Sequence, residues 1–298
     1  MTELLREVSL DQARTLDVLL GGAPTGPAIV LHHGTPLDAS TWSDWHEAAE
    51  HRGARIVSVT RPGYATSTRR PGRSVADVAA DVAAVLDQLG IDEYVTAGWS
   101  GGGPHALACA ALHPDRCRAA ATLAGVAPYG VTGLDFLEGM GPENVAEFGA
   151  ALQGEPALRG WLAENAEPFR HVTGPQIAAA FGGLVPEIDR QMLQGGYAEH
   201  MATEMRRALH AGFDGWVDDD LAFVRPWGFE LSEIGVPVTV WQGDLDLMVP
   251  ASHGAWLVDH LPGAQSRTPV GHGHISLVTQ YRAEILEWLL GGWSSTSD

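Results

Sequence analysis

Short hydrophobic segments rich in β-branched residues recur along the chain and are separated by segments with helical spacing. The clearest lie at residues 28–34, 55–60, 94–98, 119–125 and 237–243, and a further strand is expected at 264–270. Their apolar character is continuous rather than alternating, which is typical of strands covered on both faces. The pattern therefore predicts a mostly parallel sheet.

The segment 74–90 has the spacing of a helix that packs on such a sheet. Apolar residues recur from Val75 to Leu89 at intervals of three and four, and Gly90 marks the expected end. A strand, a helix and a parallel strand form a right-handed crossover. We therefore predict a doubly wound α/β fold, with its ligand crevice at the carboxyl ends of the strands.

The regular alternation stops near Pro128 and resumes near Ser232, with short helical patterns broken by Gly and Pro in between. We interpret residues 128–228 as an inserted helical cap on a core formed by residues 1–127 and 229–290. Residues 291–298 are interpreted as a flexible tail. The cap is rich in aromatic residues and Met, most of which should form its own core, while the others would line a hydrophobic substrate chamber.

The composition excludes several classes of partner. The formal net charge is −19, and all 18 basic residues are scattered arginines, which argues against nucleic-acid binding. No membrane span is expected, and the N-terminal segment lacks the pattern of a secretory signal, so we expect a cytoplasmic protein. Cys109 and Cys117 are too few for a disulfide scaffold or a zinc site and are interpreted as buried free thiols.

Ser100 is the candidate nucleophile. It lies in Gly-Trp-Ser-Gly-Gly at 98–102, between a predicted strand and a helical segment, where a sharp turn would expose its hydroxyl. Gly98 and Gly102 relieve the crowding at such a turn. The amide of Gly101 would point at the helix N-terminus, where an oxyanion is stabilised. The alternative is a glycine-rich connection without a catalytic role.

A second oxyanion donor is expected in the loop that follows the strand at 28–32. There the amide of Thr35 is the candidate, because Pro36 has no N–H and Gly34 permits a close approach. A plain strand-end turn is the alternative interpretation. The adjacent His32 and His33 are interpreted as structural residues.

A serine hydroxyl needs an imidazole to accept its proton and a carboxylate to orient that imidazole. Asp244 and Asp246 follow one predicted strand, and His272 and His274 follow the next. Asp246 is favoured as the acid because it lies just before the Val-Pro that starts the next helix, whereas Asp244 would brace the turn. On the residues alone, either histidine remains a candidate base.

Taken together, five motifs resemble the α/β-hydrolase superfamily. They are HGTP at 33–36, RPGY at 61–64, GWSGG at 98–102, GDLDLMVP at 243–250 and GHISL at 273–277. The resemblance implies Ser100, Asp246 and His274 as nucleophile, acid and base. It also implies an oxyanion hole formed by the amides of Thr35 and Gly101, and a reaction without metal or organic cofactor.

Two residues depart from the family pattern around RPGY. Thr60 stands where Asp is common, and Ala65 replaces a Gly, which affects the local loop shape and not the expected triad. A serine at position 100 also excludes the haloalkane dehalogenase branch, which needs a carboxylate nucleophile there.

We therefore expect a small-molecule carboxylic ester hydrolase that acts on a small to medium apolar ester through an acyl-enzyme. Lactonases, proline iminopeptidase-like amidases or aminopeptidases, cofactor-free perhydrolases and carbon–carbon bond hydrolases share this fold, so the reaction stays open. The alternative from another class is a non-catalytic ligand-binding module with the hydrolase fold.

Overall fold

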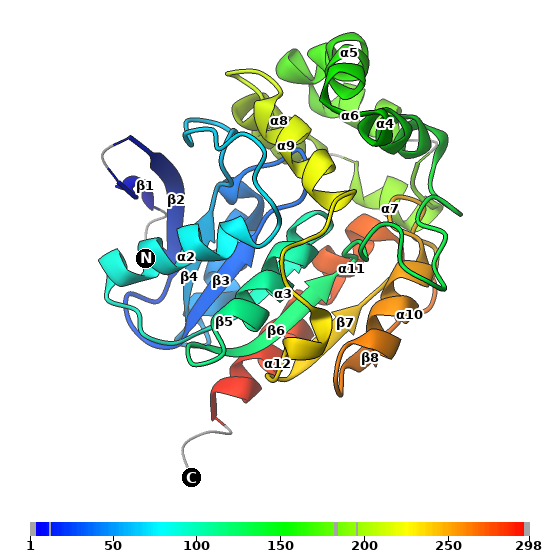
Figure 1. The fold of residues 1–298 in the computed structure, drawn as a ribbon. Helices are drawn as coiled ribbons and strands as arrows, with labels where there is room; N and C mark the ends of the chain where they lie inside the picture. Colours follow the sequence, from blue (N-terminus) through cyan, green and yellow to red (C-terminus); the bar gives the residue numbers. More distant parts are fainter. Residues whose placement is uncertain (1–3, 12, 182–183, 195, 295–298) are drawn as a thin grey trace.

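The computed structural model describes residues 4–11, 13–181, 184–194 and 196–294, and an eight-stranded sheet forms its centre (Figure 1). The strands are β1 (Leu4–Ser9), β2 (Thr15–Gly22), β3 (Ala28–His32), β4 (Arg55–Val59), β5 (Tyr94–Trp99), β6 (Cys117–Leu123), β7 (Val238–Trp241) and β8 (Gln265–Arg267). Their order in the sheet is β1-β2-β4-β3-β5-β6-β7-β8. Strands β3 to β8 run parallel, whereas β2 is antiparallel to both β1 and β4. The predicted mostly parallel α/β fold is thus confirmed.

Helices cover both faces of this sheet. Outside the insertion they are η1 (Ala39–Trp45), α1 (His46–Glu50), α2 (Asp77–Leu89), α3 (Gly102–Leu112), η4 (Leu231–Glu233), α10 (Ala251–His260), α11 (His274–Gln280) and α12 (Arg282–Ser294). One buried cluster joins the sheet to α2, α3 and α10, and a second joins it to α1, α11 and α12. The predicted crossover helix is α2, and it ends at Gly90, whose φ of 63° is left-handed.

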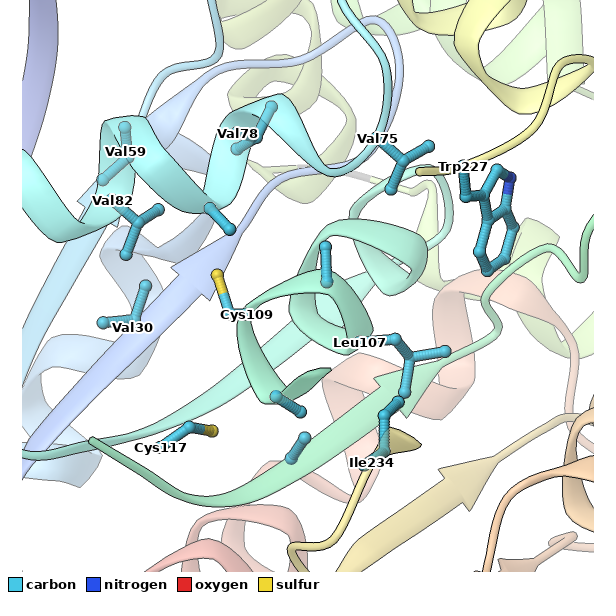
Figure 2. Packing of buried hydrophobic residues seen from close by; sticks show 14 of the residues in the cluster. Val30, Val59, Val75, Val78, Val82, Leu107, Cys109, Cys117, Trp227 and Ile234 are labelled. Atoms are coloured by element: carbon cyan, nitrogen blue, oxygen red, sulfur yellow. The ribbon is translucent and has the colours of Figure 1, made fainter. Parts of the chain in front are cut away.

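Alternate residues of the central strands pack in the two clusters, which lie on opposite faces of the sheet. Val30 packs in the first cluster, while its neighbours Ile29 and Leu31 pack in the second. Because successive side chains of a strand point to opposite faces, burial on both faces explains the continuous apolar segments in the sequence. Figure 2 shows the first cluster, where Val30 and Cys109 lie beneath α2. Cys109 and Cys117 are free and buried, as expected.

A helical insertion follows β6 and lies over one edge of the sheet (Figure 1). Its helices are α4 (Pro142–Gln153), α5 (Glu155–Asn165), η2 (Glu167–His171), α6 (Gly174–Ala180), α7 (Glu187–Met192), α8 (Gly196–Ala208) and α9 (Asp214–Phe223). They all fall within the segment 128–228 that the sequence predicts as a cap. The loop that leads from β6 into α4 contains no helix.

Two features of the termini differ from the sequence-based expectation. The N-terminal strands β1 and β2 were not expected, and they extend the sheet by an antiparallel pair. Helix α12 continues to Ser294, so residues 291–294 are helical and do not belong to the predicted tail, and residues 295–298 lie outside the described residues. Across the described ranges, every helix is too short or too polar to cross a membrane.

Candidate active site

Ser100 occupies a strained turn between β5 and α3. Its φ is 54°, a left-handed value that is uncommon for a residue with a side chain. A Cβ added at Gly98 would lie 2.0 Å from the carbonyl oxygen of Gly102, and one added at Gly102 would lie 2.3 Å from that of His32. The Ser100 amide donates to the Leu123 carbonyl of β6 at 2.8 Å. Close backbone packing therefore holds the turn and requires both glycines.

His274 and Asp246 form a buried pair at the carboxyl ends of the neighbouring strands. The Nδ1 atom of His274, the first residue of α11, lies 2.7 Å from Oδ2 of Asp246. The other carboxylate oxygen, Oδ1, accepts the amides of Met248 and Val249, both at 2.9 Å. The carboxylate is thus fixed on both sides, and the Nε2 atom of His274 points away from it.

The two alternative candidates, Asp244 and His272, make contacts outside the Ser100 cavity. Asp244 is exposed, and its Oδ1 accepts the amides of Gly271 at 2.7 Å and His272 at 3.2 Å. His272 lies beside Tyr281, with its Nε2 3.4 Å from the hydroxyl oxygen. Neither Asp244 nor His272 lines the cavity that contains Ser100, whereas His274 does.

The loop with Thr35 meets the start of α3 beside Ser100. A Cβ added at Gly34 would lie 3.4 Å from the Cβ of Ser100, and one added at Gly101 would lie 2.5 Å from Oγ1 of Thr35. Thr35 and Gly101 both line the cavity. The Gly101 amide precedes the first turn of α3, where amides lack intrahelical acceptors. The two predicted oxyanion donors therefore flank the serine.

A buried ionic cluster lies beneath the Thr35 loop. Asp219 of α9 accepts Oγ1 of Thr35 at 2.7 Å, Nη2 of Arg61 at 2.6 Å and Nη2 of Arg73 at 2.6 Å. The two arginines and the aspartate have fully buried side chains. Burial opposes ionisation of Asp219, but both guanidinium groups outweigh it and hold the pKa of this carboxyl well below its usual value.

This cluster gives Arg61 of the RPGY motif a structural role and connects the insertion to the Thr35 loop. His33 takes part as well, since its Nε2 accepts the Arg61 amide at 3.0 Å and its Nδ1 lies 2.7 Å from the Gly34 carbonyl oxygen. The sequence analysis did not identify Asp219 or Arg73. The only available signal for Asp219 was the run of three acids at 218–220 inside an apolar segment.

A second carboxylate of the insertion supports the histidine. Asp189 of α7 is fully buried, and its two oxygens accept the amides of Ile275 and Ser276, both at 2.9 Å. These are the first-turn amides of α11, directly after His274. Asp189 therefore fixes the helix end that carries the imidazole, and sequence analysis missed this residue too.

A cavity of about 260 Å³ lies between the sheet edge and the insertion, with Ser100 and His274 in its wall. Most of its lining is apolar. The insertion contributes aromatic and methionine side chains, namely Phe148, Trp161, Phe169, Phe181, Met201, Met205, Trp216 and Phe223. The same wall contains the carboxyl groups of Glu143, Glu147 and Asp220.

Comparison with known proteins shows the family of this chain. Residues 27–281 match the α/β-hydrolase fold family, and the chain belongs to that family. It is 31% identical over 160 residues to epoxide hydrolase B of Mycobacterium tuberculosis, a match that spans 46% of this chain and only 45% of that enzyme's length.

Two further similarities cover more of the chain. A bifunctional esterase/perhydrolase of Acinetobacter calcoaceticus is 26% identical over 232 residues, which cover 77% of this chain and 78% of that protein. The crystal structure of a bromoperoxidase from Bacillus anthracis superposes with a TM-score of 0.72 at 19% identity, covering 98% of this chain and all of the other, and supports the fold.

Proposed function

We propose that this α/β hydrolase is a serine carboxylic ester hydrolase. The observation that carries the proposal is the strained Ser100 turn, which shares one cavity with a histidine that is hydrogen-bonded to a buried aspartate. These are the parts that nucleophilic catalysis by serine requires.

In the acylation step, Ser100 Oγ attacks the acyl carbon of the ester while Nε2 of His274 takes the hydroxyl proton. Asp246 stabilises the resulting imidazolium through its contact with Nδ1. The amides of Thr35 and Gly101 stabilise the negative charge that develops on the carbonyl oxygen. When the tetrahedral intermediate collapses, the C–O bond to the alcohol breaks, and His274 returns the proton to the departing alkoxide.

In the deacylation step, water takes the place of the alcohol. His274 removes a proton from this water as it attacks the acyl carbon, and the carboxylic acid leaves as the Ser100 oxygen regains its proton. The protein supplies the nucleophile, the base and the oxyanion donors, so the proposed reaction needs no metal or organic cofactor.

The cavity and one relative support an ester as the substrate. A volume of about 260 Å³ with mainly apolar walls suits a small to medium organic group. The esterase/perhydrolase of Acinetobacter calcoaceticus is a relative whose name includes this activity.

Replacement of the nucleophile tests the proposal. Ser100→Ala should lower kcat for aryl and alkyl esters on the order of a millionfold, on the scale known for serine proteases. Labelling with a fluorophosphonate, followed by peptide mass spectrometry, should place the adduct on Ser100. Ser252→Ala is the matched control, because Ser252 is exposed on α10, and this variant should keep full activity.

Two results would contradict the assignment. Ester turnover near the wild-type rate in Ser100→Ala would exclude Ser100 as the nucleophile. A folded wild-type protein that neither hydrolyses esters nor reacts with the fluorophosphonate would instead support a non-catalytic binding module.

A further inference from the structure

Two carboxyl groups that the proposed reaction does not use meet in the wall of the cavity. Glu147 belongs to α4 and Asp220 to α9, and their carboxyl groups lie close enough to interact in the cavity wall. The indole Nε1 of Trp216 donates to Oε1 of Glu147 at 2.5 Å. The pair is therefore held from two helices of the insertion and lies in the same cavity as Ser100.

Two neighbouring carboxyl groups in a buried site resist ionisation. Burial raises the pKa of both groups, and the neighbouring Glu147 charge raises the pKa of Asp220 further, well above its usual value. The pair therefore holds a proton more tightly than two separate carboxyl groups would.

The described wall of the cavity offers these two carboxyl groups no cationic partner. Among the described residues that line the cavity, His274 is the only basic one, and it is bonded to Asp246. Arg61 and Arg73 lie outside the cavity lining, and both form ion pairs with Asp219. Asp220 is only 1% exposed, so water does not reach its Oδ2 atom freely. Within the described part of the chain, this oxygen also has no hydrogen-bond partner.

An acceptor without a donor is costly in an apolar site, so Oδ2 of Asp220 indicates a missing donor, and two carboxyl groups without a cation favour a positively charged one. The surrounding walls suit such a group, because Phe148, Trp161 and Trp216 line the same cavity. Aromatic faces attract a cation that has been removed from water.

We propose that the Glu147 and Asp220 side chains bind a protonated amino group of the substrate. The inference rests on the proposed function, since it takes this cavity to be the substrate site, and it narrows the substrate to apolar esters that carry one ammonium group. The N–H groups of this cation supply the donor that Oδ2 of Asp220 lacks.

Binding to the Ser100→Ala protein tests the inference without turnover. Calorimetry would compare n-hexylammonium, 1-hexanol and hexanoate, which share a chain length and differ in the charge of the head group. We expect hexylammonium to bind at least tenfold more tightly than hexanol, and hexanoate to bind most weakly.

Amide replacements identify the residues responsible. In Asp220→Asn or Glu147→Gln, one carboxyl group of the pair remains to bind the ammonium group, so the preference for hexylammonium should stay within about threefold. The double replacement removes both carboxyl groups and should abolish the preference. Glu164→Gln, on the exposed surface of α5 and outside the cavity lining, removes one charge from the chain and should change nothing.

The outcomes separate this inference from the proposed function. Equal binding of hexanol and hexylammonium, or a preference that survives in a double variant with a wild-type thermal transition, would overturn the ammonium site even if the protein hydrolyses esters. If the double variant does not fold, the wild-type protein provides the test, because a bound ligand should protect Ser100 from the fluorophosphonate. Equal protection by hexanol and hexylammonium would overturn the ammonium site. Absence of ester hydrolysis with selective ammonium binding would refute the reaction and leave the site standing.

Discussion

Replacement of Asp246 by asparagine should leave the fold intact and disable the proposed base. The Oδ1 position accepts two backbone amides, from Met248 and Val249, so the asparagine oxygen must stay there. The NH2 group is then forced into the Oδ2 position, 2.7 Å from Nδ1 of His274. Because an NH2 group only donates, Nδ1 has to be the acceptor and the ring proton moves to Nε2.

An imidazole with its proton on Nε2 cannot take the proton of Ser100. The equivalent change in a serine protease lowers kcat about 10⁴-fold, which corresponds to about 5 kcal/mol of transition-state stabilisation. We expect a loss of that size here. The loss of stability should be smaller, about 1–2 kcal/mol, because the two amides keep an acceptor but lose its charge.

Steady-state hydrolysis of an aryl ester at neutral pH measures the loss of kcat, and urea denaturation measures the stability. Asp244→Asn is the matched control, since Asp244 is exposed and accepts only loop amides that an asparagine oxygen can also accept. It should keep kcat within about threefold. The reasoning would be refuted if Asp246→Asn stayed within tenfold of the wild type, or if Asp244→Asn were the variant that lost activity.

Two further predictions concern buried carboxyl groups of the insertion. Asp189→Ala leaves two first-turn amides of α11 without their acceptor, so we expect the free energy of unfolding to fall by about 3 kcal/mol. We also expect at least a tenfold lower kcat at similar KM. Asp189→Asn should partly restore both quantities. Unchanged kcat in a destabilised Asp189→Ala protein would show that this residue does not position His274. For Glu204, burial raises the pKa from 4.5 to about 7, against the opposing effect of His200, whose Nε2 lies 2.8 Å away. The folded protein therefore holds this proton more tightly than the unfolded chain, and its stabilising contribution is complete below about pH 4.5 and is lost as the pH rises through about 7. Glu204→Gln should remove this loss of about 3 kcal/mol in urea denaturation between pH 5 and 8, and an identical pH dependence in both proteins would contradict it.

The sequence was sufficient to predict the elements whose signals are local. The central strands are buried on both faces, so their composition is enough to identify them, and the Ser100 turn is specified by two glycines that the backbone itself requires. Strand β1 gave no such signal, because it lies at the edge of the sheet and exposes Leu4 and Leu5. Strand β2 carries a buried polar residue, Asp17, within its apolar segment.

The supporting residues of the site depend on contacts between distant segments. Arg61 and Asp219 are 158 positions apart, and in the sequence an acid that is fully buried looks the same as an acid exposed on a helix surface. Gly and Pro also divide the insertion into short helices, whose packing partners the sequence does not reveal. Asp189, Asp219 and Asp220 could therefore be assigned only once the packing of the insertion was known.

The bond between Asp219 and the two core arginines has a consequence for protein engineering. Helix α9 is the last helix of the insertion, yet its Asp219 forms ion pairs with Arg61 and Arg73 of the core beneath Thr35. A chimaera in which the insertion of a relative replaces the whole insertion of this chain would leave two buried guanidinium groups without a counter-ion. A foreign insertion should therefore be joined to this chain before Asp214, so that α9 stays with the core.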